Sequence, residues 1–209
     1  ILKHLKERQG ESTRENTLKS FGGAGENTAY TATTSYFNPK LCKIIYSSYC
    51  PKNGTIFDPF SSVVRPYMAK ILDYNYVGCE VRKDECDKIN EMLNTNSLFE
   101  ESDVRVLNMD CREFETDQKF DLVFTCPPYW NLETYSEQDN DLSFITDYSD
   151  FLTEMSKVYS KCSSLMHNES YCCFVVADFR DYSEGRKLIN HLVPFVSDMI
   201  RCGEESGLS

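Results

Sequence analysis

Three features are scarce or absent in this 209-residue sequence: long apolar runs, paired cysteine motifs and positive charge. No run of about 18 apolar residues occurs, so the sequence predicts no membrane-spanning helix. Residues 1–16 also lack the apolar core and the small-residue cleavage site of a secretory signal peptide. We therefore expect neither a membrane anchor nor a leader within this sequence.

Cysteine is abundant, but its spacing does not indicate a disulfide framework or a metal site. None of the ten cysteines forms a C-x-x-C pair, and only three histidines accompany them. Zinc sites use such pairs, so we expect no bound metal. Many of the cysteines lie in apolar stretches, where a free thiol behaves as a small hydrophobe. Reduced thiols favour an intracellular protein of the cytoplasm or nucleus.

Positively charged residues are fewer than negatively charged ones. The sequence has 22 lysines and arginines and 33 aspartates and glutamates, which gives a net charge of −11. Nucleic-acid binding depends largely on lysine and arginine contacts to phosphate. The sequence therefore argues against tight nucleic-acid binding by this chain alone. No internal repeat and no separate recognition domain is visible.

Two regions are predicted from composition and periodicity. Residues 1–33, with many polar residues and several glycines, are expected to form a flexible N-terminal arm or linker. Residues 34–209 are expected to form one α/β domain, in which segments of strand length alternate with segments of helical spacing. The predicted strands are 54–58, 76–80, 103–107, 120–125 and 171–177, and the predicted helices are 39–49, 65–74, 83–93, 147–162 and 185–201, the last kinked at Pro194. This alternation predicts a doubly wound, mostly parallel sheet.

Polar side chains stand where several predicted strands end, which is where doubly wound sheets bind ligands. Glu80 closes the second strand about twenty residues after the first, a position from which an acid can accept hydrogen bonds from ribose hydroxyls. Asp110 follows the third strand and could accept from the exocyclic amine of a purine. Asp58 ends the first strand in the segment FDPF. Each of the three also has an ordinary structural interpretation, as a solvated strand end or a turn cap.

The segment TCPPYWNLE, which begins at Thr125, follows the fourth strand. A strand cannot continue through Pro127 and Pro128, because proline has no N–H for the ladder and its φ is restricted. The chain must leave the sheet in a stiff, preset conformation. Such stiffness indicates either a rigid surface turn or a group that has to be held still.

Together, these segments resemble the S-adenosylmethionine-dependent DNA amino-methyltransferases, which methylate adenine N6 or cytosine N4. The segment FDPFSSVVRPYMAKILDYNYVGCEVRKDEC resembles the cofactor half of this family, and FDLVFTCPPYWNLETYS resembles its catalytic half. The similarity is greatest to phage-type DNA methylases with a CPPY-LE-YS run. The segment SYFNPKLCKIIYSSY resembles the helix before the cofactor loop. The resemblance covers roughly residues 34–208.

The resemblance implies a Rossmann-like methyltransferase fold and S-adenosylmethionine as the cofactor. By the same resemblance, Asp58 would lie by the methionine end of the cofactor, Glu80 by the ribose and Asp110 near the adenine. Phe60 would also bind the cofactor.

The catalytic half implies that Cys126, Pro127, Pro128 and Tyr129 hold a base flipped out of the duplex. The carbonyl of Pro127 and the side chain of Cys126 would accept the amine hydrogens, and Tyr129 would stack on the base. Glu133 and Tyr135 match the family run without a role that we can derive.

The sequence departs from the family in three places. The turn from Asp58 to Pro66 contains no glycine, whereas the family pattern is DPF-x-G-x-G, so S-adenosylmethionine affinity is expected to be reduced or lost. Cys126 is a weaker acceptor than the usual Asp, Asn or Ser. The C-terminal antiparallel hairpin, strands 6 and 7, is expected to be absent from this chain. The edge of strand 171–177 would then be covered by a missing segment or a second subunit.

Three functions remain open from the sequence. The first is methyl transfer to a DNA base, with help from a partner chain because of the negative charge. The second is a catalytically inactive, methyltransferase-like binding or assembly subunit. The third is methylation of protein or RNA, which uses the same chemistry. Cytosine-C5 methylation is disfavoured, because its nucleophilic cysteine follows the proline, whereas Cys126 precedes it.

Overall fold

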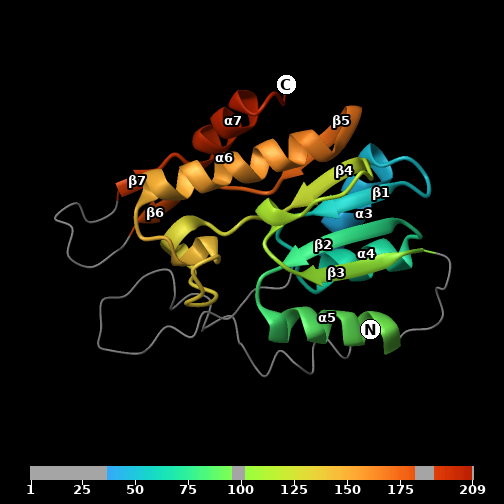
Figure 1. Ribbon diagram of the computed structural model, residues 1–209. Helices are drawn as coiled ribbons and strands as arrows, with labels where there is room; N and C mark the ends of the chain where they lie inside the picture. Colours follow the sequence, from blue (N-terminus) through green and yellow to red (C-terminus); the bar gives the residue numbers. More distant parts are fainter. Residues whose placement is uncertain (1–36, 96–101, 182–190, 209) are drawn as a thin grey trace. The chain divides into compact units, whose positions relative to one another are not determined.

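Strands and helices alternate in the computed structural model, which describes residues 37–95, 102–181 and 191–208 (Figure 1). The helices are α3 (Pro39–Tyr49), α4 (Val64–Ile71), α5 (Lys83–Thr95), α6 (Tyr148–Leu165) and α7 (Phe195–Glu205). The strands are β1 (Thr55–Asp58), β2 (Asn75–Glu80), β3 (Val104–Asn108), β4 (Phe120–Thr125), β5 (Met166–Phe174), β6 (Phe179–Asp181) and β7 (His191–Val193). The predicted arm, residues 1–33, lies outside the described residues, so its boundary stays a prediction.

Five of these strands form one parallel sheet in the order β3-β2-β1-β4-β5. The chain builds outward from β1 to β3 and then crosses to the other side of β1 for β4 and β5. This is the strand order of the Rossmann-type sheet, and the order reverses between β1 and β4. The predicted Rossmann-like, doubly wound fold is confirmed.

Side chains of the central strands alternate between two buried clusters, one on each face of the sheet. Phe57 and Val123 belong to the cluster that also contains residues of α6 and α7. Ile56 and Leu122 belong to the cluster that contains residues of α3, α4 and α5. Because successive strand residues point to opposite faces, a central strand must be apolar on both. Figure 1 shows α6 and α7 on one side of the sheet and α5 on the other.

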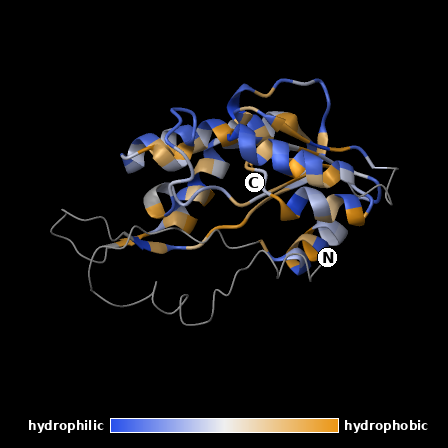
Figure 2. Cartoon of the chain, turned by 90° about the horizontal axis from the view of Figure 1, so that it is seen from below, coloured by the Kyte–Doolittle hydropathy of each residue, from blue (hydrophilic) through white to orange (hydrophobic). Residues whose placement is uncertain are grey.

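The helices are amphipathic, and side-chain caps define where several of them begin. Hydrophilic and hydrophobic colours alternate along the helices in Figure 2, as expected for helices buried on one side. Asn38 caps α3 by accepting from the backbone N–H of Lys40, with Pro39 in the first turn. Asp147 caps α6 by accepting from Ser149 and Asp150. Such caps stabilise a helix by about 1 kcal/mol each.

The fifth strand differs from its prediction in extent and in position. It begins at Met166 rather than at residue 171, because a bulge admits the polar segment 167–170. Glu169 in this bulge has a φ of 67°. Among the described residues β5 pairs only with β4, so it is an edge strand there. Its covering by another segment or by a second subunit stays a prediction. Tyr171 on this strand is 54% exposed.

An antiparallel hairpin follows the fifth strand, although the sequence predicted none, but it does not extend the main sheet beside β5. Strands β6 and β7 pair antiparallel, with Phe179 opposite Val193, as a separate two-stranded sheet. Residues 191–193 therefore belong to a strand, not to the predicted helix 185–201. Helix α7 begins only at Phe195, and Pro194 precedes it instead of kinking it. Residues 185–190 of that prediction lie outside the described part.

Within the described ranges, no helix is long and apolar enough to cross a membrane. All ten cysteines fall within those ranges and are unpaired.

Candidate functional site

The carboxyl ends of β1 and β4 meet at the reversal of the strand order, and a hydrogen bond joins them. The Oγ1 of Thr125, at the end of β4, donates to Oδ1 of Asp58, at the end of β1, over 2.6 Å. Both residues are fully buried. The loops that leave these strands carry the predicted cofactor segment and the predicted Cys126–Tyr129 run. The structure therefore brings the two segments of the family resemblance together.

The carboxylate of Asp58 is saturated with hydrogen bonds from the chain itself. Besides Thr125, it accepts from the backbone N–H of Phe60 at 3.1 Å, from Nε of Arg65 at 2.6 Å and from the hydroxyl of Tyr76 at 2.5 Å. A carboxylate has about four acceptor sites, so all are used. Asp58 caps its turn, as the structural interpretation predicted, and also ties together β1, β2, β4 and α4. Its contact with a cofactor stays a prediction.

Arg65 is a buried partner that the sequence analysis missed. It is 2% exposed, its guanidinium donates to the backbone carbonyl of Phe60, and it lies 5.0 Å from the ring centre of Phe37. Burial alone would lower the pKa of this guanidinium, but the neighbouring Asp58 raises the pKa above its ordinary value. Arg65 is therefore a permanent cation. The Phe60 ring packs against the cluster beneath α6.

The glycine-free loop after β1 approaches β2 closely at a glycine that lies in the strand. The backbone N–H of Ser61 donates to the carbonyl of Cys79 at 2.8 Å, and its Oγ lies 3.0 Å from the hydroxyl of Tyr76. A Cβ on Gly78 would lie 2.6 Å from Oγ and 2.7 Å from Cβ of Ser61. The loop can lie this close to β2 because Gly78 has no side chain. This glycine in the middle of an apolar strand was the available sequence signal.

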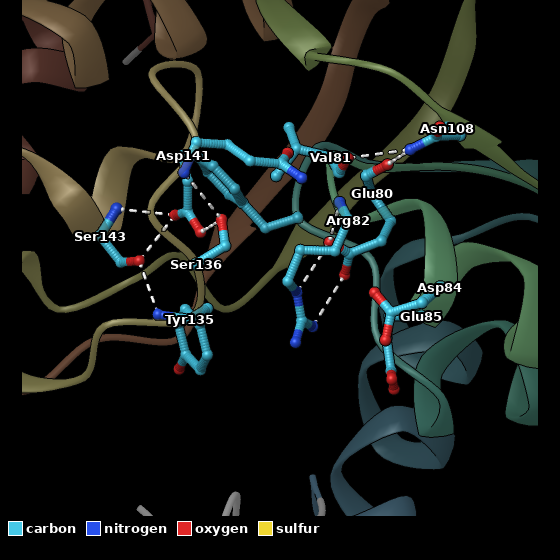
Figure 3. Close-up of polar contacts among 12 residues, drawn as sticks. Glu80, Val81, Arg82, Asp84, Glu85, Asn108, Tyr135, Ser136, Asp141 and Ser143 are labelled. Carbon is cyan, nitrogen blue, oxygen red and sulfur yellow. Dashed lines mark hydrogen bonds and ion pairs between the residues drawn. The ribbon is translucent and has the colours of Figure 1, made fainter.

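Glu80 ends β2 as a largely buried acid held by its own neighbour, Arg82 (Figure 3). Its Oε1 accepts from the backbone N–H of Arg82 at 2.9 Å and from Nε at 3.2 Å, and its Oε2 accepts from a terminal guanidinium nitrogen at 3.3 Å. Burial raises the pKa of Glu80, and Arg82 opposes this shift. Asn108 fixes the same strand end by donating to the carbonyls of Glu80 and Val81, at 2.9 Å each.

Asp110 repeats this arrangement at the end of β3. Its carboxylate accepts from the backbone N–H and from the guanidinium of Arg112, two residues later. Asp110 caps the single-turn helix η1 (Cys111–Glu113). Arg112 also donates to Glu154 of α6. The spacing of acid and arginine, E-x-R and D-x-R, is the sequence signal for these two pairs.

The Cys126–Tyr129 run leaves β4 with both prolines buried. Burial raises the pKa of the Cys126 thiol, an effect that Arg65 partly offsets. The ring of Tyr129 lies 5.2 Å from that of Phe195, and its hydroxyl donates to the carbonyl of Val175 at 3.4 Å. Burial raises the pKa of Tyr129 to about 12, so it stays a phenol at neutral pH.

The connection from β4 to α6, residues 126–147, is called here the β4–α6 loop. It contains the single-turn helices η2 (Trp130–Leu132) and η3 (Leu142–Phe144), which contact each other. Tyr135 donates its backbone N–H to Oγ of Ser143 at 2.9 Å, and its hydroxyl donates to Glu133. The guanidinium of Arg82 lies 5.6 Å from the Tyr135 ring centre. The loop is thereby attached to the end of β2.

Trp130 occupies an unusual conformation directly after the Cys126–Tyr129 run. Its φ is 50°, which is unfavourable for a residue with a side chain. The residue is 3% exposed, and its indole Nε1 has no hydrogen-bond partner among the described residues. Backbone strain beside a strand end is common at functional sites.

Comparisons with known proteins find similar solved structures but no similar sequence. No protein-family model and no curated protein matches this sequence. Similar solved structures include a TehB-like SAM-dependent methyltransferase from Corynebacterium glutamicum, at 14% identity and a TM-score of 0.49, over 92% of this chain and 78% of that chain. TrmN from Thermus thermophilus has 12% identity and a TM-score of 0.49, over 68% and 39% of the two chains. A putative methyltransferase from Thermoplasma acidophilum has 15% identity and a TM-score of 0.47, over 84% and 61%.

This chain spans 41% to 49% of the length of three other similar structures. At these identities and scores, the similarities carry no activity and no substrate over to this chain.

Proposed function

We propose that this chain transfers a methyl group from S-adenosylmethionine to an exocyclic amine of DNA, adenine N6 or cytosine N4. The observation that carries the proposal is the arrangement at the reversal of the sheet. The largely buried acid Glu80 ends β2, the proline-stiffened run follows β4, and β1 lies between these two strands. In doubly wound sheets, ligands bind beyond the strand ends at this reversal.

The chemistry of the strand ends fits a nucleoside cofactor. Glu80 would accept from the ribose hydroxyls, and Asp110 from the adenine amine. Phe60 and the saturated Asp58 would lie by the methionine end, with Asp58 supporting the loop rather than giving up one of its four bonds. When bound, S-adenosylmethionine would supply an electrophilic methyl group on a sulfonium.

The run after β4 would position the target amine. The lone pair of an aromatic amine is delocalised into the ring, which makes the nitrogen a poor nucleophile. Accepting its hydrogens in fixed geometry would direct the lone pair towards the methyl group, which is catalysis by positioning and by fixed dipoles. Because Cys126 stays a protonated, weakly accepting thiol, the carbonyl of Pro127 would be the main acceptor. The buried Pro128 and the Tyr129 ring would complete the base contact.

Electrostatics favour a partner for DNA binding. The β4–α6 loop has five acidic residues and no lysine or arginine. The loop beside the proposed target site would therefore repel phosphate, and DNA affinity requires cations. We infer that a basic partner chain, or a segment outside this sequence, supplies the phosphate contacts.

A second candidate is a non-catalytic binding or assembly subunit with a methyltransferase-type fold. The observation that favours it is that Asp58, Glu80 and Asp110 are each paired with an arginine of the same chain. The glycine-free loop over Gly78 also favours a non-catalytic subunit, because the lack of loop glycines predicts reduced affinity for S-adenosylmethionine.

Titration calorimetry with S-adenosylmethionine separates the two candidates. If the chain is a methyltransferase, we expect micromolar binding of S-adenosylmethionine. This binding should be lost in Glu80→Ala and retained in Glu91→Ala, because Glu91 is an exposed acid on α5. No heat at millimolar ligand leaves the non-catalytic subunit as the function.

Transfer of labelled methyl groups to duplex DNA, with Tyr129 variants, then tests the base contact. Tyr129→Ala is expected to lose about tenfold or more in rate, since stacking on a base is worth about 1–3 kcal/mol. Tyr129→Phe keeps the ring and should retain activity. The exposed Tyr171→Ala serves as the matched control. Equal rates for Tyr129→Ala and the control would exclude the stacking role.

A further inference from the structure

Arg82 contacts two parts of the molecule that the proposed function assigns to different ligands. Its backbone N–H and its guanidinium bind the carboxylate of Glu80, the proposed ribose acceptor. The same guanidinium lies over the ring of Tyr135, on the β4–α6 loop that follows the proposed target-base run. Figure 3 shows the Arg82 side chain extending from the end of β2 towards this loop. Neither Arg82 nor Tyr135 has a role that follows from the sequence alone.

The carboxylate of Glu80 cannot serve Arg82 and a ribose in full at the same time. Arg82 already supplies three hydrogen bonds, two to Oε1 and one to Oε2. A carboxylate offers about four acceptor sites, so one remains. Two ribose hydroxyls need two sites, and therefore at least one guanidinium bond has to open. The Arg82 side chain is 28% exposed, so it can turn towards solvent.

The part of the loop that Arg82 contacts behaves as one unit. Asp141 accepts from Oγ of Ser136 at 2.7 Å and from both the N–H and Oγ of Ser143, at 2.9 and 2.7 Å. Ser143 in turn accepts from the N–H of Tyr135. A change at the Tyr135 ring is therefore transmitted to residues 135–143 together.

We infer that Arg82 couples cofactor binding to the β4–α6 loop: a nucleoside at Glu80 displaces the guanidinium, and the loop loses its attachment to β2. This inference rests on the proposed function, because it takes Glu80 as the nucleoside acceptor. It makes Arg82 a positioning residue and predicts an order of events. The methyl donor binds first, and the loop, still held by the bond from Arg112 to the carbonyl of Asn140, then rearranges more readily around a target base.

Hydrogen–deuterium exchange of peptides covering residues 132–144 tests the coupling, with S-adenosylhomocysteine as the probe at about pH 8. In the parent, saturating probe should raise exchange in these peptides about two- to fivefold, the loss of one exposed cation–π contact. In Arg82→Gln the loop should exchange at the raised rate without ligand and show no further change. Arg82→Lys keeps the charge and should restore part of the ligand response.

The affinity for S-adenosylhomocysteine is a second measurement, and it would not increase in Arg82→Gln if Arg82 only stabilised the fold. Removing a competitor for Glu80 should tighten binding of the probe by about two- to fivefold in Arg82→Gln, the size expected for a partly exposed ion pair. Arg105→Gln is the matched control, because Arg105 pairs with the carboxylate of Asp103 over the same two-residue spacing, on an exposed surface away from Glu80. This control should leave affinity and loop exchange unchanged.

Two results would overturn the coupling. If the parent binds the probe and exchange in residues 132–144 does not rise, or if Arg82→Gln and the parent respond alike, Arg82 does not link the two sites. If neither the parent nor Arg82→Gln binds the probe, the proposed function fails as well, and the coupling fails with it. The first result leaves methyl transfer standing, so the two failures are distinguishable.

Discussion

Substituting Gly78 by alanine tests whether the strand glycine is what lets the glycine-free loop lie over β2. The new Cβ would lie 2.6 Å from Oγ and 2.7 Å from Cβ of Ser61, and 2.9 Å from Cε1 of Tyr76. Ser61 cannot withdraw freely, because its N–H bonds to Cys79 at 2.8 Å and its Oγ lies 3.0 Å from the Tyr76 hydroxyl. The loop therefore has to move as a whole.

The magnitude follows from the contacts that such a movement breaks. Two hydrogen bonds at about 1 kcal/mol each give a destabilisation of about 2 kcal/mol, within the range for overpacking a core. In an open strand position, Gly→Ala would instead stabilise by about 0.5–1 kcal/mol. The sign of the effect thus distinguishes close packing from free space.

A double-mutant cycle isolates the contact. Ser61→Gly removes the two closest clashing atoms at the loss of one hydrogen bond, whereas the 2.9 Å contact with Cε1 of Tyr76 remains. Gly78→Ala should therefore cost less in that background than in the parent, without becoming neutral. Urea denaturation measures both steps, and the single variant should also unfold about 4–8 °C lower than the parent. Equal costs of Gly78→Ala in the two backgrounds would refute the close-packing argument, as would a stabilised single variant.

Two further predictions concern the charged strand ends. Arg65→Met should destabilise the fold by about 3–5 kcal/mol in chemical denaturation, because it leaves the fully buried Asp58 unpaired. Asp58→Asn in the same chain should recover part of this loss, and an Arg65→Met cost below about 1 kcal/mol would contradict the ion pair. Glu80 has a pKa raised above 4.5 by burial, so the stability that it contributes is present below pH 4.5 and is lost as the pH rises through its folded-state pKa. Glu80→Gln should abolish this decline between pH 4.5 and neutrality, and an unchanged pH profile of unfolding would show that Glu80 does not cause it.

The fold was predictable where local periodicity carries the information. Strand β4 has the predicted bounds, Phe120–Thr125, and α3 has the predicted bounds, Pro39–Tyr49. Central parallel strands are apolar on both faces, and the helices between them are amphipathic. Each pattern therefore predicts its own strand or helix from local sequence alone. The prediction failed at the end of the chain. The polar bulge 167–170 conceals the start of β5, and β6 and β7 are only three residues long in the described part.

The sequence by itself determined which residues stand at the ends of the strands, because alternation of elements places Asp58, Glu80, Asp110 and the Cys126 run at one edge of a parallel sheet. Only the tertiary structure decided how those groups are paired. Which donors a carboxylate binds depends on the side chains that lie next to it in the folded chain. Only the packed structure therefore shows that the carboxylates of Asp58, Glu80 and Asp110 each bind an arginine.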